Sequence, residues 1–198
     1  RGGALEARLI ASIDQIQAHR AAGALGGFVS GVSLADVASS DAHYRRVRDL
    51  LVQHEVLFFR NQEKTPAVFA AFARAFGDAL GHPAYATVND APDVQILEST
   101  PENRSKIEIW HSDMTFMQCP PSFTLLQSQI IPEVGGDTLW ASATAAYDAL
   151  SPEMRAFLTP LKAVNDFRHG FRESLAEPGG ADRLAPAIAE NPPVDHPL

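Results

Sequence analysis

Short apolar runs beyond residue 80, each closed by proline, glycine or asparagine, restrict the fold more than any other feature of this sequence. Apolar runs of about four to eight residues between such turn residues are typical of β-strands. The predicted strands cover residues 94–97, 107–110, 123–131, 138–141 and 161–167. A helical insertion with starts at Ser142 and Ser151 interrupts them. We therefore expect the second half of the chain to be mostly β structure.

The first 80 residues are predicted to be richer in helix. Leu5, Leu9 and Ile13 recur at helical spacing, which predicts an amphipathic N-terminal helix within residues 1–22. Residues 23–31 then contain four glycines, which favours a turn or a short irregular strand. No Lys-Ser/Thr pair follows these glycines, so the segment does not match a phosphate-binding loop.

A helix, a buried strand and a second helix are expected next. Ser40 or Asp41 is suited to cap the first helix. Residues 55–60 (EVLFFR) form a β-rich apolar run that predicts the strand. Thr65, followed by proline, has the residue types of a helix N-cap and first turn.

The composition excludes several classes of protein. Lys and Arg number 16 against 24 Asp and Glu, a net charge of −8, so the chain as a whole lacks the positive field of a nucleic-acid binder. No apolar stretch approaches the ~20 residues of a membrane span. A single cysteine, Cys119, excludes an internal disulfide framework or a cysteine metal cage. With no secretory leader at its start, we expect a cytoplasmic protein.

The segment from Trp110 to Phe116 (WHSDMTF) carries the most informative pattern. In a strand that runs into a turn, His111 and Asp113 project to the same side and can converge on one cation. A distant second histidine would complete the 2-His-1-carboxylate site of non-haem Fe(II) oxygenases. The alternative is a hydrogen-bonded histidine–aspartate pair at a strand end, which a bare His-x-Asp favours.

The order of motifs around this segment resembles one family. The motifs are Gly81-His82-Pro83-Ala84-Tyr85, Trp110 to Phe116, Pro120-Pro121, Gly135 to Trp140, Asp166-Phe167-Arg168, Asn191-Pro192-Pro193 and His196-Pro197. In this order and spacing they resemble the taurine dioxygenase family of Fe(II)- and 2-oxoglutarate-dependent dioxygenases, over roughly residues 23 to 198. The resemblance implies an α+β, mainly β fold: a double-stranded β-helix, or jelly roll, with flanking helices. We expect one domain over residues 1–198, with the C-terminal part of the roll missing from this chain.

The resemblance also implies roles for individual residues. His111 and Asp113 are similar to the first two iron ligands, and a third, a histidine, is expected beyond Leu198. Thr138 is similar to the threonine that binds the distal carboxylate of 2-oxoglutarate. The residues expected to line the substrate pocket are His82, Tyr85, Ile107 and Phe171, and those expected to support the site are Trp110, Phe116 and Trp140.

The function that the resemblance implies is oxidation of a small organic anion, a sulfonate, an alkyl sulfate or a similar compound, by O2. Succinate, CO2 and sulfite or its equivalent would be released. Ile107 stands where taurine enzymes tend to carry an amide, which favours an apolar alkyl or aryl anion over taurine. The expected assembly is a homo-oligomer, with no nucleic acid or membrane as partner.

Two other classes stay open. A non-catalytic binding or scaffold protein could use the same roll without a complete iron site. A zinc hydrolase is a weaker option, because a strand-turn His-x-Asp is not the helical His-x-x-x-His pattern of such enzymes.

Overall fold

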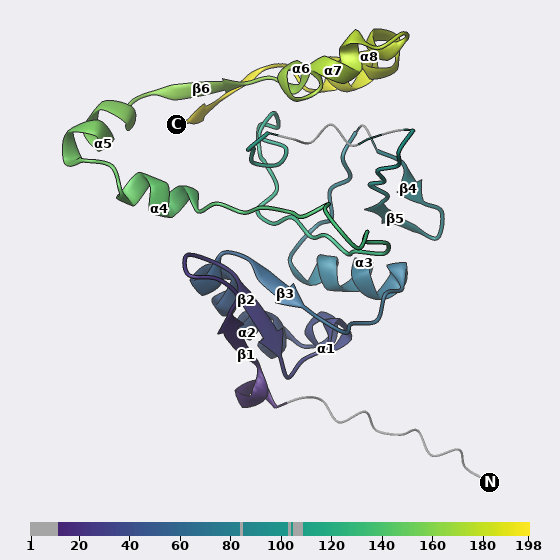
Figure 1. The fold of residues 1–198 in the computed structure, drawn as a ribbon, viewed down its shortest axis with the longest axis vertical. Helices are drawn as coiled ribbons and strands as arrows, with labels where there is room; N and C mark the ends of the chain where they lie inside the picture. The colour runs from purple at the N-terminus through teal and green to yellow at the C-terminus, as the bar shows by residue number, and fades with distance from the viewer. Residues whose placement is uncertain (1–11, 84, 103, 105–108) are drawn as a thin grey trace. The chain divides into compact units, whose positions relative to one another are not determined.

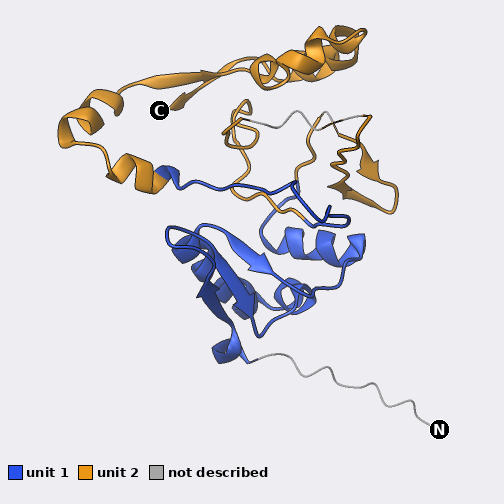
Figure 2. Ribbon diagram, in the orientation of Figure 1, with its two compact units in different colours: residues 1–79, 127–143 blue, residues 80–126, 144–198 orange. Residues whose placement is uncertain are grey.

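The computed structural model describes residues 12–83, 85–102, 104 and 109–198. Its contacts divide the chain into two compact units, coloured separately in Figure 2. The first comprises Arg1–Ala79 and Gln127–Ala143, and the second Leu80–Leu126 and Thr144–Leu198. The single domain expected from the sequence stays a prediction.

A three-stranded sheet forms the first unit's β structure (Figure 1). Strand β1 (Gln17–Arg20) pairs antiparallel with β2 (Gly27–Ser30), and β2 pairs parallel with β3 (Leu57–Phe59). The register places Phe28 opposite Phe58, and their rings lie 5.4 Å apart between centroids. The strand predicted over residues 55–60 is confirmed in its central three residues.

The N-terminal helix predicted within residues 1–22 is wrong in the part that the structure describes. Residues Ile13–Gln15 form a single 3-10 turn, η1, and β1 follows it directly. Gly26 has a φ of +94°, which glycine adopts without strain, and this allows the chain to fold back. Strand β1 then pairs with β2, and the ladder provides the backbone hydrogen bonds that a helix would otherwise supply. Residues 1–11 lie outside the described residues.

Three helices complete the first unit, and each begins at a side-chain cap. These are α1 (Leu34–Ser39), α2 (Asp41–His54) and α3 (Pro66–Ala75). Ser40 Oγ accepts from the His43 amide and Thr65 Oγ1 from the Val68 amide, which confirms both predicted helix starts. The buried apolar side chains of this unit include Ile16, Val37, Val47, Leu50 and Phe72.

The described part of the second unit contains two antiparallel ladders and a group of helices. Strands β4 (Thr87–Val88) and β5 (Ala91–Gln95) pair antiparallel, as do β6 (Lys162–Asn165) and β7 (Val194–Pro197). Helix α4 (Ala143–Asp148) begins at the boundary with the first unit, and α5 (Pro152–Leu158) begins at the predicted cap Ser151. Helices α6 (Phe167–Gly170), α7 (Arg172–Ala176) and α8 (Gly180–Glu190) lie between β6 and β7 in sequence.

The core of the second unit is built on Phe167, which is 1% exposed. Leu184 and Ala187 of α8 are buried against it, and Phe116, Phe171, Leu175 and Ile188 pack around them. This cluster joins the His82–Phe116 part of the chain to the helices of the C-terminal part.

Three predicted strands are not formed in the described residues. Residues 109–110 of the predicted strand 107–110 carry no ladder pairing, and residues 107–108 lie outside the described residues. Residues 123–131 and 138–141 carry no ladder pairing either, although exposure alternates residue by residue from Pro121 to Leu126 as in a strand. Apolar patterning selects an extended backbone, but a strand also requires a partner for its amides and carbonyls. Within the described residues, no helix combines the length and the apolar character needed to cross a membrane.

Candidate metal and substrate site

His111 and Asp113 lie in a turn-containing segment rather than in a strand. The turn bends at Met114, which has a positive φ of 51°. Despite this difference from the prediction, the two side chains meet: His111 Nε2 lies 3.1 Å from Asp113 Oδ1. His111 Nδ1 lies 2.8 Å from the carbonyl oxygen of Ile109, which holds the ring from its other side.

These contacts determine which atoms of His111 and Asp113 are available to bind a cation. When Nδ1 carries the proton and donates to Ile109, Nε2 presents a lone pair toward Asp113 Oδ1. Two ligand atoms each ~2.1 Å from one metal ion and at a right angle would lie about 3.0 Å apart. The observed separation fits that arrangement. It equally fits the alternative raised from the sequence, a protonated histidine paired with the carboxylate.

Thr124 forms a hydrogen bond with the second carboxylate oxygen of Asp113. Its Oγ1 donates to Oδ2 at 2.7 Å, so Oδ1 alone faces His111. A hydrogen bond to the distal oxygen of a ligating carboxylate fixes its orientation. Thr124 was not predicted from the sequence, although a hydroxyl within the apolar run 123–131 was a signal that a polar partner was needed.

A complete set of metal ligands is not present in the part of the chain that the structure describes. No group of three or more His, Cys, Asp and Glu side chains there is arranged to hold a metal ion. His196 is directed elsewhere, since its Nε2 lies 2.9 Å from the carbonyl oxygen of Met117. The third ligand expected beyond Leu198 stays a prediction.

A cluster of aromatic rings surrounds the predicted substrate residue His82. Its ring lies 4.7 Å from that of Tyr85, 5.3 Å from Phe171 and 5.7 Å from Phe116, between centroids. Phe167 stacks on Phe171 at 4.4 Å and meets Phe116 edge-on at 5.0 Å. Three of the predicted site residues, His82, Tyr85 and Phe171, are therefore brought together, with the supporting residue Phe116 beside them.

The electrostatics connect this aromatic cluster to the His111–Asp113 pair. Burial lowers the pKa of His82, and the negative charge of Asp113 opposes that change. Burial also raises the pKa of Tyr85, and the Asp113 charge raises it further. The Tyr85 hydroxyl is thus kept protonated and able to donate. Both effects place the Asp113 carboxylate within electrostatic range of the two polar groups of the cluster.

Gln95, at the end of β5, holds the backbone that carries these two groups. Its Oε1 accepts from the His82 amide at 2.6 Å, and its Nε2 donates to the carbonyl oxygens of His82 and Tyr85 at 2.7 and 3.1 Å. Gln95 falls within the apolar strand predicted over residues 94–97. A single amide inside that run was the signal that a polar partner was needed.

The other predicted residues are more scattered. Thr138 and Trp140 are exposed and belong to the first unit, whereas His111 and Asp113 belong to the second, so the 2-oxoglutarate role of Thr138 stays a prediction. Trp110, expected to support the site, is 69% exposed. Ile107 lies outside the described residues.

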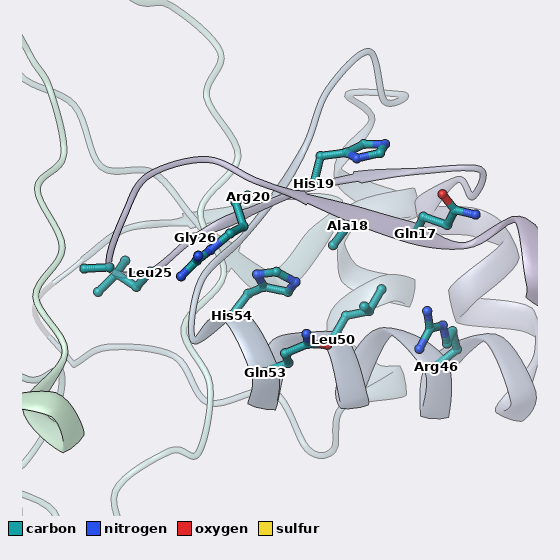
Figure 3. A pocket seen from close by; sticks show the side chains of 11 residues that line it. Gln17, Ala18, His19, Arg20, Leu25, Gly26, Arg46, Leu50, Gln53 and His54 are labelled. Carbon is teal, nitrogen blue, oxygen red and sulfur yellow. The ribbon is translucent and has the colours of Figure 1, made fainter. Parts of the chain in front are cut away.

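A separate pocket of about 580 Å³ lies in the first unit, between β1 and α2 (Figure 3). Its polar lining includes Arg20, Arg46 and His54, and Leu50 contributes to its apolar part. None of the residues predicted from the sequence to form the site lines this pocket.

Comparison with known proteins identifies the relatives of this chain. An alkylsulfatase of Acinetobacter baylyi is 32% identical over 93% of this chain and 59% of its own length. An α-ketoglutarate-dependent sulfate ester dioxygenase of Pseudomonas putida is 30% identical over 79% of this chain and 52% of its own length. The chain therefore spans between half and three-fifths of the length of these curated relatives.

Solved structures agree with these sequence matches. A taurine dioxygenase from Burkholderia xenovorans is 28% identical, with a TM-score of 0.64 over 93% of this chain and 58% of that one. AAD-2, solved with Mn(II) and N-oxalylglycine, is 25% identical, with a TM-score of 0.67 over 92% of this chain and 63% of that one. The family model for the taurine catabolism dioxygenase TauD, TfdA family matches residues 14–198. The resemblance predicted from the motif order is confirmed, and the chain belongs to the taurine catabolism dioxygenase TauD, TfdA family.

Proposed function

We propose that the whole protein is an Fe(II)- and 2-oxoglutarate-dependent dioxygenase that oxidises a small sulfate ester or sulfonate. The observation that carries this proposal is the approach of His111 Nε2 to Asp113 Oδ1, within electrostatic range of His82 and Tyr85. Relatives named for sulfate ester and sulfonate oxidation support the substrate class. The corresponding fold is the double-stranded β-helix, of which this chain would form part.

His111 and Asp113 would hold the iron, with a further histidine completing the site, and Thr138 would bind the distal carboxylate of 2-oxoglutarate. When bound, the iron and 2-oxoglutarate supply the oxidation of an unactivated C–H bond by O2. The residues of the chain orient the reacting groups and exclude water. Thr124 would keep the second oxygen of Asp113 occupied, so that only Oδ1 is offered to the metal.

The cluster around His82 offers a site for an organic anion. Tyr85 keeps its proton because burial and Asp113 raise its pKa, so its hydroxyl can donate to a sulfate or sulfonate oxygen. His82 can donate through one ring nitrogen. Phe116 and Phe171 supply apolar surface, on which each buried methylene contributes about 0.8 kcal/mol.

The proposed reaction hydroxylates the carbon that bears the sulfur-containing group. One oxygen atom of O2 enters the substrate and the other enters succinate, as 2-oxoglutarate loses CO2. The hydroxylated carbon then expels sulfate from a sulfate ester, or sulfite from a sulfonate, and leaves an aldehyde. Longer alkyl anions and phenoxyacetates are expected to be better substrates than taurine, because an unpaired amine against an apolar wall is poorly solvated.

Two measurements test this proposal on the whole protein. Anaerobic addition of Fe(II) and 2-oxoglutarate should produce a weak visible charge-transfer band. Succinate formation coupled to product should then be compared, as kcat/KM, for hexyl sulfate, pentanesulfonate, phenoxyacetate and taurine. A protein that contains Fe(II) but shows no band would contradict the reaction class. Taurine as the best substrate would contradict only the substrate preference.

A second candidate is a non-catalytic binding protein on the same fold. The observation behind it is that the described residues bring together two candidate ligands, His111 and Asp113, and no group of three. Titration of the whole protein with Fe(II) separates the two functions. An iron enzyme should bind one equivalent tightly, whereas the binding protein should bind it weakly and still bind an organic anion.

A further inference from the structure

We propose that Gln95 is the positioning residue that sets the spacing of His82 and Tyr85, and through them selects the substrate anion. The geometric part of this inference is independent of the enzyme's activity. The part that concerns the substrate rests on the proposed function.

The side-chain amide of Gln95 is fully engaged with one short piece of backbone. It accepts from the His82 amide at 2.6 Å and donates to the carbonyl oxygens of His82 and Tyr85 at 2.7 and 3.1 Å. Both of its N–H groups and its oxygen are thus used. The Tyr85 amide also donates to the His82 carbonyl, at 3.3 Å, which closes a turn between the two residues.

Gln95 is itself fixed by the hairpin on which it lies. It ends β5 and pairs with Thr87 of β4, so its backbone is held by a ladder rather than by a loop. The side chain is half-buried. A paired strand end therefore holds the backbone of His82 and Tyr85, whose rings lie 4.7 Å apart between centroids.

The hydrogen-bonding pattern makes the choice of residue specific. A glutamate of the same shape can accept from His82 N–H, but when ionised it has no proton for the two carbonyl oxygens. Gln95→Glu would place a negative charge against those carbonyls. We therefore expect Gln95→Glu to displace the turn at least as much as Gln95→Ala, which leaves the carbonyls free to bond water.

The geometric part is tested by ¹⁹F NMR of the whole protein labelled with 3-fluorotyrosine. The signals of Tyr85 and Tyr44 are each identified by their loss in the corresponding Tyr→Phe variant. Gln95→Glu and Gln95→Ala should shift the Tyr85 signal and leave that of Tyr44 unchanged, because Tyr44 packs against Phe76 in the first unit. Gln53→Glu, an exposed glutamine on α2, is the matched control. An unmoved Tyr85 signal in both Gln95 variants would overturn the proposal.

The selection of the anion is tested by kinetics with hexyl sulfate. Both Gln95 variants should raise KM about tenfold, which corresponds to the loss of one good hydrogen bond to a charged group. Their kcat should stay within about twofold of the wild-type value. In a His82→Ala, Tyr85→Phe background the Gln95 substitutions should have no further effect on KM, because Gln95 acts through those two residues. A full additional effect in that background would overturn the positioning role. A wild-type protein that oxidises no anion would refute the proposed function, while the ¹⁹F result would still decide the geometry.

Discussion

Asp113 divides its two carboxylate oxygens between different partners, with Oδ1 toward His111 and Oδ2 accepting from Thr124. This division suits a carboxylate that binds a metal through one oxygen, because the hydrogen bond to the other oxygen fixes the orientation of the carboxylate. The His-x-Asp spacing predicted the meeting of the two side chains. It could not predict Thr124, which reaches Asp113 across eleven positions of the sequence.

The substitution Asp113→Ala should abolish the visible band formed with Fe(II) and 2-oxoglutarate, because it removes one of three expected protein ligands. Ser112→Ala is the neighbouring control. Ser112 is exposed, and its substitution should leave the band in place. Anaerobic absorption spectra of both variants provide the measurement, and a band that survives in Asp113→Ala would remove Asp113 from the metal site.

Replacing Thr124 by valine should weaken Fe(II) binding about tenfold, the lower end of the usual effect of losing a hydrogen bond to a metal ligand. The valine keeps the shape of threonine but cannot donate to Asp113 Oδ2. Calorimetric titration with Fe(II) measures the change, and Thr124→Ser, which retains a hydroxyl, should restore most of the affinity. Equal loss in both variants would indicate that packing, not the hydrogen bond, is what Thr124 contributes.

At the scale of single elements, the helix starts were the most predictable features. Ser40, Thr65 and Ser151 act as caps at the expected positions because capping depends on residues only two or three places apart. The strands of the second half were less predictable, because pairing depends on distant residues: β6 finds its partner in β7. Helices α7 and α8 were not predicted, because the glycines and Pro186 among residues 172–190 do not give a helical sequence pattern. Burial of Leu184 stabilises α8 where the helix propensity of its residues is low.

Helix α1 offers a direct test of capping energetics. Ser33 accepts from the Asp36 amide, and the Asp36 carboxylate accepts in return from the Ser33 amide, each at 3.1 Å. Ser33→Ala should lower the free energy of unfolding by about 1 kcal/mol. Ser39→Ala, at the other end of the same helix, should change it by less than about 0.5 kcal/mol, because its exposed hydroxyl bonds back to the carbonyls of Ala35 and Asp36 within the helix. Urea denaturation distinguishes the two variants, and equal effects would argue against the reciprocal cap.

At the scale of the whole molecule, the family was predictable from the order and spacing of the motifs. Each motif alone is weak evidence for the family, but the combined order is specific. The predicted extent, from about residue 23 to 198, lies within the match over residues 14–198. The resemblance also predicted His82, Tyr85 and Phe171 as pocket residues, but the contacts among their rings were not predictable. These rings come together beside a buried core that none of their local sequence patterns encodes.

The 198-residue chain should bind an apolar dye strongly. Ile130, Val134 and Leu139 are 93%, 90% and 71% exposed and lie in one segment of the first unit. Apolar side chains that remain exposed within one short segment offer such a dye an apolar surface. Fluorescence of anilinonaphthalene sulfonate should therefore fall when Ile130 and Val134 are both replaced by glutamate.

Val52→Glu is the matched control for this measurement. Val52 is 70% exposed on α2, and a single apolar residue on a helix surface is ordinary. Its replacement should change dye fluorescence much less than the paired substitution. A fall as large as that of the pair would show that the dye does not report on the 130–139 segment.

The ladder between β6 and β7 also determines where this protein can change length. Its pairs run from Lys162 with Pro197 to Asn165 with Val194. The segment between residues 165 and 194 therefore has its two ends held together by this ladder. The entropic free-energy cost of closing such a segment rises slowly with its length, by about 0.6 kcal/mol for each doubling. Residues added at the exposed turn 177–179, far along the chain from both ends of the ladder, would leave the register of β6 and β7 unchanged. The segment that carries Phe171 can thus gain residues at this exposed turn over evolution while its two anchoring strands keep the same pairing.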